Sequence, residues 1–207
     1  MKQIFTLLTV IYLFTTNILA YENTYYLHKV SQFELLTSSK DAKIMMLGDS
    51  ITERGLWSEL TSSSNIINRG ISGDTTLGVL NRLDMLNPNL EKAYVMIGVN
   101  DLFKGRSVNY IFKNYIKIIA ILKKKNIEPI IESCLFVGSN LPNSYNIKIK
   151  KLNLLLLKYA KKNKISFIDL NTKLSPEGYL SYKYSLDGVH LNANGYALWL
   201  KELKLGK

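Results

Sequence analysis

Five short runs rich in isoleucine and valine constrain this chain more than any other feature. They lie at residues 43–48, 65–69, 93–98, 127–133 and 165–170. Short, continuously apolar runs are typical of strands buried on both faces, as in a parallel sheet that helices cover on both sides. We therefore expect an α/β protein with a five-stranded parallel sheet in a three-layer α/β/α sandwich.

The stretches between these runs carry helical periodicity. Apolar residues over 108–122 recur at steps of three and four, which predicts one face of an amphipathic helix. A second helix is expected over about 145–163, and a third over 193–203, after the polar capping candidate Asn192. Because no repeat, linker or low-complexity stretch divides the chain, we expect a single domain over residues 21–207.

The first twenty residues have a different character. They begin with the positively charged Lys2, continue as an apolar run and reach a small residue at Ala20. This pattern predicts a cleavable signal peptide over residues 1–20, and hence export to the periplasm or the exterior. The alternatives, a buried first helix or an uncleaved anchor, are disfavoured because polar residues interrupt the run before it reaches the length of a membrane span.

The charge pattern bears on possible partners. The formal net charge is +11, which becomes +10 without the signal segment because that segment carries Lys2 and no acidic residue. Three lysine clusters fall on or beside the expected helices, so we interpret them as solvated helix faces, with weak attraction to an anionic envelope surface as the alternative. No nucleic-acid-binding motif accompanies the charge, and no nucleic-acid partner is expected. The clusters are Lys123–Lys125, Lys148 with Lys150 and Lys151, and Lys161, Lys162 and Lys164.

Cys134 is the one cysteine, so the domain contains no internal disulfide. Its apolar neighbours predict a small buried residue at the end of a strand, without a role in chemistry.

Small and polar residues follow three of the expected strands. Gly-Asp-Ser occupies 48–50, Gly-Ile-Ser-Gly-Asp occupies 70–74 and Gly-Val-Asn-Asp occupies 98–101, while Asp-Gly-Val-His at 187–190 precedes the last helix. Each block alone is typical of a turn, a helix cap or a surface loop. Because ligands bind at the carboxyl ends of strands in open α/β sheets, their joint appearance there indicates a site.

The residue types in these blocks suit acyl transfer. This chemistry needs a hydroxyl nucleophile, a base, a carboxylate that orients the base, and donors to an oxyanion. Of the two histidines, His28 lies in the N-terminal lead-in, which leaves His190 as the well-placed base. Asp187 precedes it by three residues and can reach its Nδ1 in a tight loop that Gly188 permits, leaving Nε2 to face Ser50.

The blocks GDSIT at 48–52, ISGDTT at 71–76, GVND at 98–101 and DGVH at 187–190 resemble the four that define the SGNH or GDSL hydrolase family. Flanking residues resemble the branch with platelet-activating-factor acetylhydrolase catalytic subunits and bacterial acyl and sialate O-acetylesterases. The resemblance implies a flavodoxin-like fold and ester hydrolysis without a metal or organic cofactor. It assigns Ser50 as nucleophile, His190 as base and Asp187 as its orienter.

The resemblance also implies an oxyanion hole formed by the backbone N–H groups of Ser50 and Gly73 and by the Asn100 side chain. Ile51 stands where the family name has leucine, a change between apolar residues that leaves the chemistry intact. Three further carboxylates are interpreted as structural groups that order the loops rather than as a second acid–base pair. They are Asp49, Asp74 and Asp101.

Together these observations predict an exported serine esterase that hydrolyses short-chain acyl esters, above all O-acetyl esters on a sugar or glycan. A lysophospholipase or thioesterase of the same fold is the runner-up, and its apolar groove would draw on Leu56, Trp57, Leu102 and Phe103 as exposed residues, although core packing explains them equally well. A glycan-binding module without catalysis is the third hypothesis. Trp57 and Trp199 fit either the core or a ligand contact, and nothing in the sequence specifies an oligomeric state.

Overall fold

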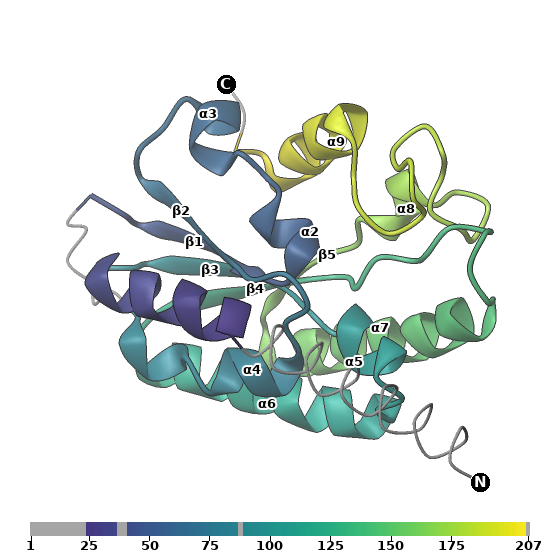
Figure 1. Ribbon diagram of the computed structural model, residues 1–207. Coiled ribbons are helices and arrows are strands. Elements are labelled where there is room, and N and C mark those ends of the chain that lie inside the picture. Colours follow the sequence, from purple (N-terminus) through teal and green to yellow (C-terminus); the bar gives the residue numbers. More distant parts are fainter. Residues whose placement is uncertain (1–23, 37–40, 87–88, 206–207) are drawn as a thin grey trace, which may run out of the picture.

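The computed structural model describes residues 24–36, 41–86 and 89–205, and it places one twisted sheet between two layers of helices (Figure 1). All strand pairs are parallel and their order is β2-β1-β3-β4-β5. The predicted α/β/α sandwich and its five strands are confirmed. The strands are β1 (Ile44–Gly48), β2 (Ile66–Gly70), β3 (Lys92–Met96), β4 (Glu128–Glu132) and β5 (Ser166–Ile168).

Helices cover both faces of the sheet (Figure 1). One layer holds α4 (Thr76–Leu80), α5 (Val99–Phe103), α6 (Val108–Lys124) and α7 (Ser144–Asn163). The other holds α3 (Trp57–Thr61), α8 (Asn171–Leu174) and α9 (Ala193–Leu203). Two short elements, α2 (Ser50–Glu53) and the 3-10 helix η2 (Leu83–Met85), join strands to these layers.

The three longest predicted helices are confirmed, and their starts have a physical cause. The side chain of Ser107 accepts a hydrogen bond from the backbone of Tyr110 at the start of α6. Asn192 does the same for Gly195 at the start of α9, as its capping residue type predicts. All nine lysines of the three clusters are exposed, which agrees with their interpretation as solvated helix faces.

The core fills both sides of the sheet. Met45, Met46 and Leu47 are consecutive in β1 and all fully buried, because helices cover both faces of a central strand. On the α3 and α9 side, Trp57 and Trp199 are also buried and meet edge to face, with ring centroids 4.8 Å apart. Their burial makes both tryptophans core residues, and burying a large apolar side chain stabilises a fold by about 1.5–3 kcal/mol.

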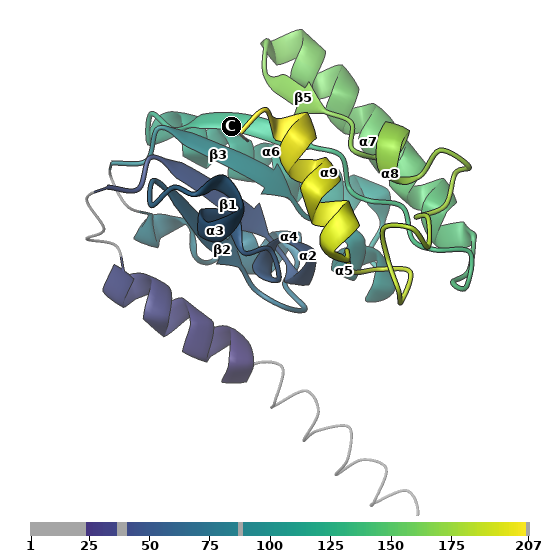
Figure 2. The same cartoon turned by 90° about the horizontal axis from the view of Figure 1, so that it is seen from above.

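A helix over residues 24–35 packs beside the β2 edge of the sheet (Figure 2). The ring of Phe33 lies under the guanidinium group of Arg69, 4.6 Å from the ring centroid. Lys29 pairs with Glu53 at 3.0 Å, and the Tyr26 hydroxyl donates to the carbonyl of Gly78 at 2.7 Å. Residues 24–36 of the lead-in therefore pack against the domain.

The predicted signal peptide over 1–20 lies outside the described residues. Within the described ranges, no helix combines the length and the apolar character that crossing a membrane requires.

β1 has β2 on one side and β3 on the other, so the strand order reverses direction at β1. Gly48 at the end of β1 is in register with Gly70 of β2 and Met96 of β3, so the three strands end at the same level. In open parallel sheets such a reversal leaves a crevice at the carboxyl ends, where ligands bind. The three predicted strand-end blocks all lie there.

Candidate active site

Ser50 lies at the first position of α2, directly after β1. The preceding Asp49 caps this helix, because its carboxylate accepts a hydrogen bond of 3.0 Å from the backbone N–H of Ile51. Arg82 fixes the strand end itself by donating from its guanidinium group to the carbonyl of Gly48. The hydroxyl of Ser50 is therefore held at the carboxyl edge of the sheet, where only 7% of the residue is exposed.

His190 meets Ser50 from the opposite end of the chain. Its Nε2 lies 3.0 Å from Ser50 Oγ, and its Nδ1 lies 2.6 Å from Asp187 Oδ2. An ionised carboxylate only accepts hydrogen bonds, so the proton of a neutral imidazole resides on Nδ1 and Nε2 is left as an acceptor for the serine hydroxyl. The structure thus brings the predicted serine, histidine and aspartate together in one hydrogen-bonded chain.

The charge of Asp187 is stabilised by its local hydrogen bonds. Partial burial raises the pKa of this carboxyl, but hydrogen bonds from the His190 ring and from the backbone N–H groups of His190 and Val189 outweigh burial. The pKa therefore lies well below its ordinary value, and the carboxylate stays ionised beside the imidazole. The negative charge of the Asp187 carboxylate, next to Nδ1, stabilises the positive charge that the ring carries when Nε2 accepts a proton.

Neighbouring segments hold the loop that carries these two residues. Gly188 adopts a positive φ of 79°, and a side chain there would collide with Asn140. The carbonyl of Gly188 accepts a bond of 2.7 Å from the N–H of Gly138, and Asn140 Nδ2 donates to the carbonyl of Asp187 at 3.0 Å. The Ser185 hydroxyl accepts from the N–H of Gly188 at 2.9 Å. Only glycine suits position 188, as the tight loop predicts.

The second block forms a turn that leaves a backbone donor free. Gly73 has a φ of 76°, in the left-handed region that favours glycine, and a side chain at this position would point into open space. Within the described part of the chain, the N–H of Gly73 has no hydrogen-bond acceptor. An unpaired N–H beside open space at the strand ends is a donor available to a ligand.

The third block places an amide next to this turn. Asn100 lies in the first turn of α5, and its Nδ2 donates to the carbonyl of Asp74 at 3.0 Å. An amide nitrogen carries two protons, so this bond orients the group and leaves its second proton for a ligand. The residues predicted for an oxyanion hole thus come from three neighbouring loops at one sheet edge.

The three further carboxyl groups are buried, and each has a hydrogen-bond or ion-pair partner within the protein. Asp49 accepts from Ile51 as described, and Asp74 forms an ion pair with Arg82 at 2.9 Å, in which both side chains are at most 3% exposed. Asp101 accepts from the N–H and the hydroxyl of Thr76, at 2.8 and 2.7 Å. Burial raises the pKa of all three, to about 7 for Asp49. These bonds tie the blocks together, in agreement with a structural rather than an acid–base role.

Sequence reasoning missed the partners that support the site. Arg82 is a charge within the stretch between two strands, which ordinarily indicates a solvated position, yet it is buried against Asp74 and the carbonyl of Gly48. Thr76 and Ser185 carry no local signal because their partners are distant or depend on the loop conformation. The nearest available signal was the need of a buried Asp74 for a cation.

Other sequence-based expectations are resolved by burial. His28 is exposed on the helix over 24–35, and the site's serine contacts His190 instead. Cys134 is buried, and burial raises the pKa of its thiol, so it remains an unreactive core residue. Trp57 and Leu102, each 1% exposed, are core residues and not exposed groove residues, which corrects the suggestion made for a long-chain lipid site. In the described ranges, no cluster of three or more histidine, cysteine or acidic side chains is arranged to hold a metal ion.

Comparison with known proteins identifies similar lipases and acylhydrolases. A model of the GDSL-like Lipase/Acylhydrolase family matches residues 46–198. Among solved structures, a Streptococcus pneumonia protein provisionally designated a platelet activating factor superposes with a TM-score of 0.85, at 26% identity over 93% of this chain and 97% of that one. A GDSL-like lipase from Bacteroides thetaiotaomicron superposes with a TM-score of 0.72, at 25% identity over 84% of this chain and 95% of that one.

A relative by sequence is larger than this chain. The N-acylneuraminate cytidylyltransferase of Streptococcus agalactiae serotype V is 31% identical over 173 residues, which cover 80% of this chain and 40% of that protein. The chain therefore spans about 40% of the length of the curated relatives that it matches.

Proposed function

Because the chain belongs to the GDSL-like lipase/acylhydrolase family of ester-hydrolysing enzymes, we propose that Ser50 is its nucleophile, His190 its general base and Asp187 the orienter of that base. The observation that carries this proposal is the pair of contacts made by His190, 3.0 Å to Ser50 Oγ and 2.6 Å to Asp187 Oδ2. The same contacts favour an enzyme over a glycan-binding module, since mere binding has no physical need for them.

The reaction follows from these positions. Ser50 Oγ attacks the ester carbonyl while its proton passes to His190 Nε2, and the N–H groups of Ser50 and Gly73 with the amide of Asn100 receive the oxyanion. His190 then protonates the leaving alcohol as the tetrahedral intermediate collapses to an acyl-enzyme. Water that loses its proton to the same nitrogen attacks this second ester, and the acid leaves as Ser50 regains its proton.

For the substrate we propose a short acyl ester, in the first instance an O-acetyl group on a carbohydrate. The support is a relative that is named for an N-acylneuraminate, a sugar derivative, and of which this chain spans 40%. A long-chain lipid substrate would need an apolar groove, and two residues suggested for one, Trp57 and Leu102, are in the core.

Hydrolysis of p-nitrophenyl esters from acetate to palmitate tests chemistry and chain length together, with Ser50→Ala as the matched control. We expect the highest kcat/KM on acetate and its loss in the variant, and then release of acetate from O-acetylated N-acetylneuraminic acid. A maximum at long chains would move the substrate to lipids or thioesters while retaining Ser50. Activity that survives in Ser50→Ala would contradict the assignment of the nucleophile.

Export is a separate part of the proposal and rests on residues 1–20. N-terminal sequencing of protein recovered outside the cytoplasm is expected to give a chain that starts near Tyr21. A recovered chain that still begins at Met1 would contradict cleavage.

A further inference from the structure

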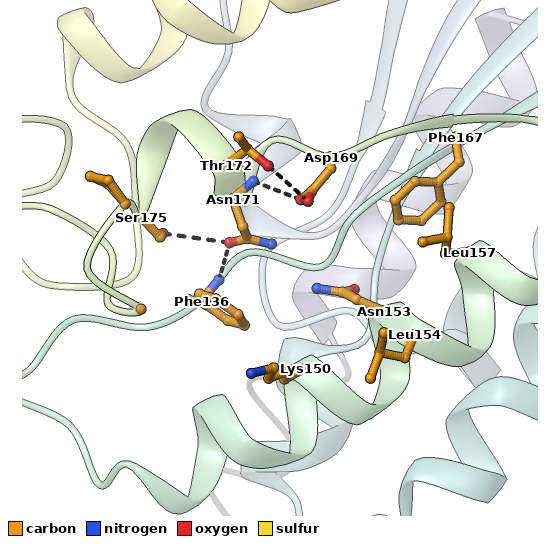
Figure 3. Close-up of a pocket in the computed structure, with 12 residues that line it drawn as sticks. Phe136, Lys150, Asn153, Leu154, Leu157, Phe167, Asp169, Asn171, Thr172 and Ser175 are labelled. Atoms are coloured by element: carbon orange, nitrogen blue, oxygen red, sulfur yellow. Dashed lines mark hydrogen bonds between the residues drawn. The ribbon is translucent and has the colours of Figure 1, made fainter.

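Two neighbouring cavities lie along the segment 175–182, which connects α8 to the loop of Asp187 and His190. The larger, of about 460 Å³, lies between α7, the end of β5 and α8 (Figure 3). The smaller, of about 230 Å³, is lined by side chains that include Ser139, Glu177, Tyr179 and Tyr182. Pro176 lines both cavities, so they adjoin each other.

Most polar side chains of the larger cavity have partners within the protein. Asn171 accepts from the N–H of Phe136 at 2.7 Å, and the Thr172 hydroxyl donates to Asp169 at 3.0 Å (Figure 3). Asn153 makes two bonds to the backbone of Cys134, at 2.8 and 2.9 Å. These groups hold the segment after β4 in place and are not free to bind a ligand.

The smaller cavity differs in this respect. Among the described residues, none provides a hydrogen-bond or ion-pair partner for the Glu177 carboxylate or for the hydroxyls of Tyr179 and Tyr182. Tyr182 is 57% exposed, so apolar surface of this large side chain remains uncovered. Aromatic faces beside unpaired hydroxyl and carboxylate groups suit a sugar, because its C–H faces pack on rings while its hydroxyls donate and accept.

The position of this cavity relates it to the ester-hydrolysing site. Ser139 lies between Gly138 and Asn140, the two residues that bond to the loop of Asp187 at 2.7 and 3.0 Å. Because consecutive Cα atoms are about 3.8 Å apart, Ser139 in the cavity wall lies next to the backbone that contacts the loop of Asp187 and His190. The segment is anchored on the other side by the N–H of Leu180, which donates to the carbonyl of Val137 at 3.2 Å. The cavity is thus formed before any ligand binds.

We propose that this smaller cavity is a subsite for a neutral pyranose unit that is glycosidically linked to the sugar whose ester reacts at Ser50. The inference rests on the proposed function and adds that the substrate is an oligosaccharide or glycan and not a free monosaccharide. A volume of about 230 Å³ is below the range of drug-sized sites and suits a single ring. The Glu177 carboxylate accepts from sugar hydroxyls and repels a second acidic sugar, which selects a neutral unit.

The test compares linked with free sugars. The probes are O-acetylated N-acetylneuraminic acid, free and linked to lactose, and O-acetylated xylose, free and within xylotriose, with p-nitrophenyl acetate reporting the amount of competent catalytic centre. For at least one pair, we expect wild-type kcat/KM to be about tenfold higher for the linked sugar. Tyr182→Ala brings this ratio close to one, while Tyr182→Phe, which keeps the ring, retains most of it.

Leu154→Ala is the matched control, because Leu154 is 50% exposed and lines the adjoining larger cavity. Its ratio is expected to equal that of the wild type. A wild-type ratio near one for both pairs, a ratio that Tyr182→Ala does not lower, or an equal loss in Leu154→Ala overturns the subsite alone. Hydrolysis of p-nitrophenyl acetate without hydrolysis of any sugar refutes the carbohydrate part of the proposed function, and the subsite with it.

Discussion

The two halves of the site are built in opposite ways. Ser50 is 7% exposed and lies above a buried ion pair whose side chains, Asp74 and Arg82, are 2% and 3% exposed. The side chains of His190 and Asp187 are 21% and 52% exposed, on a loop that bonds mainly to other loops. The nucleophile half is thus part of the interior, whereas the acid–base half is attached to its surface.

This difference predicts which substitutions lower both stability and activity and which lower activity with little loss of stability. Removing one partner from a buried, hydrogen-bonded charge leaves the other without solvation, so a substitution in the nucleophile half affects folding as well as chemistry. An exposed side chain that is lost from a surface loop is replaced by water at little cost in stability.

His190→Ala is expected to have the largest effect. Loss of the base lowers kcat/KM by about 10⁴-fold or more, because both proton transfers depend on it. The free energy of unfolding is expected to fall by only about 1 kcal/mol, the net worth of the lost hydrogen bonds to Asp187 and Ser50, which is below the cost of breaking a buried ion pair. Hydrolysis of p-nitrophenyl acetate and urea unfolding measure the two quantities. A large loss of stability would break the contrast.

Arg82→Met is expected to destabilise the protein by about 3–5 kcal/mol, because it leaves the Asp74 carboxylate buried and unpaired. Urea denaturation provides the measurement. The matched control is Lys43→Met, which breaks an ion pair of the same length, 2.9 Å, between half-exposed side chains. That control is expected to cost less than about 1 kcal/mol, and equal losses in the two variants would disprove the role of burial.

Asn100→Ala tests the chemical part of the buried half. Loss of one oxyanion donor lowers kcat by about 10²- to 10³-fold, with little change in KM, because the interaction strengthens in the transition state. The lost bond to the carbonyl of Asp74 adds a destabilisation of about 1 kcal/mol. Steady-state kinetics on p-nitrophenyl acetate check the split. Wild-type turnover in folded protein would remove Asn100 from the hole.

The two halves are also expected to respond to pH with opposite sign. Burial raises the pKa of Asp49 to about 7, from an ordinary value of 3.8, so between these pH values the folded state holds a proton that the unfolded chain has lost. Stability from this group is full below pH 3.8 and falls as pH rises to 7. The pKa of Asp187 is lowered instead, so its contribution is present above pH 3.8 and is lost as pH falls.

Urea unfolding at a series of pH values checks this expectation. Asp49→Asn retains an acceptor for Ile51 and is expected to flatten the decline toward pH 7, by on the order of 1–3 kcal/mol. Asp187→Asn is expected to leave that decline intact and to alter the acid side. Glu132, whose pKa burial raises to about 8, contributes a second decline, and Glu132→Gln separates it. A pH profile unaffected by Asp49→Asn would contradict the raised pKa.

Tyr196→Phe is expected to have the smallest effect. The Tyr196 hydroxyl donates to the carbonyl of Ile51 at 2.7 Å, and its loss leaves a buried acceptor unpaired at a cost of about 1–2 kcal/mol. Thermal denaturation is sensitive enough to detect this. Tyr110→Phe serves as control, because the half-buried Tyr110 hydroxyl has no partner in the described part of the chain. A silent Tyr196→Phe would show that α2 does not need this support.

Sequence reasoning predicted the elements with a clear period. The five strands were recognised as short continuous apolar runs, and the helices over 108–124, 144–163 and 193–203 by an apolar pattern that repeats over several turns. The helices α2, α3, α4, α5 and α8 are four or five residues long, too short to display a period of 3.6 residues. The helix over 24–35 was missed because both of its leucines, Leu27 and Leu35, are exposed, which obscures the buried face around Val30 and Phe33.

For the site, residue types and their places at strand ends indicated which residues could meet. Whether His190 reaches Ser50 depends on bonds such as that between Gly138 and Gly188, which join segments 50 residues apart and leave no local pattern. Arg82 and Thr76 were missed for the same reason. The residues of the smaller cavity, Glu177 and Tyr182 among them, lie in an irregular segment where neither period nor motif marks a ligand contact.

The contact between Ser50 and His190 joins positions 140 residues apart. The entropy cost of closing a segment rises with its length, so contacts between such distant positions form slowly. During synthesis from the ribosome, the serine emerges long before the histidine, so the growing chain carries an unactivated hydroxyl until its last helix is complete. If Ser50 and His190 act as proposed, recovery of hydrolysis after dilution from denaturant is expected to lag behind the appearance of secondary structure.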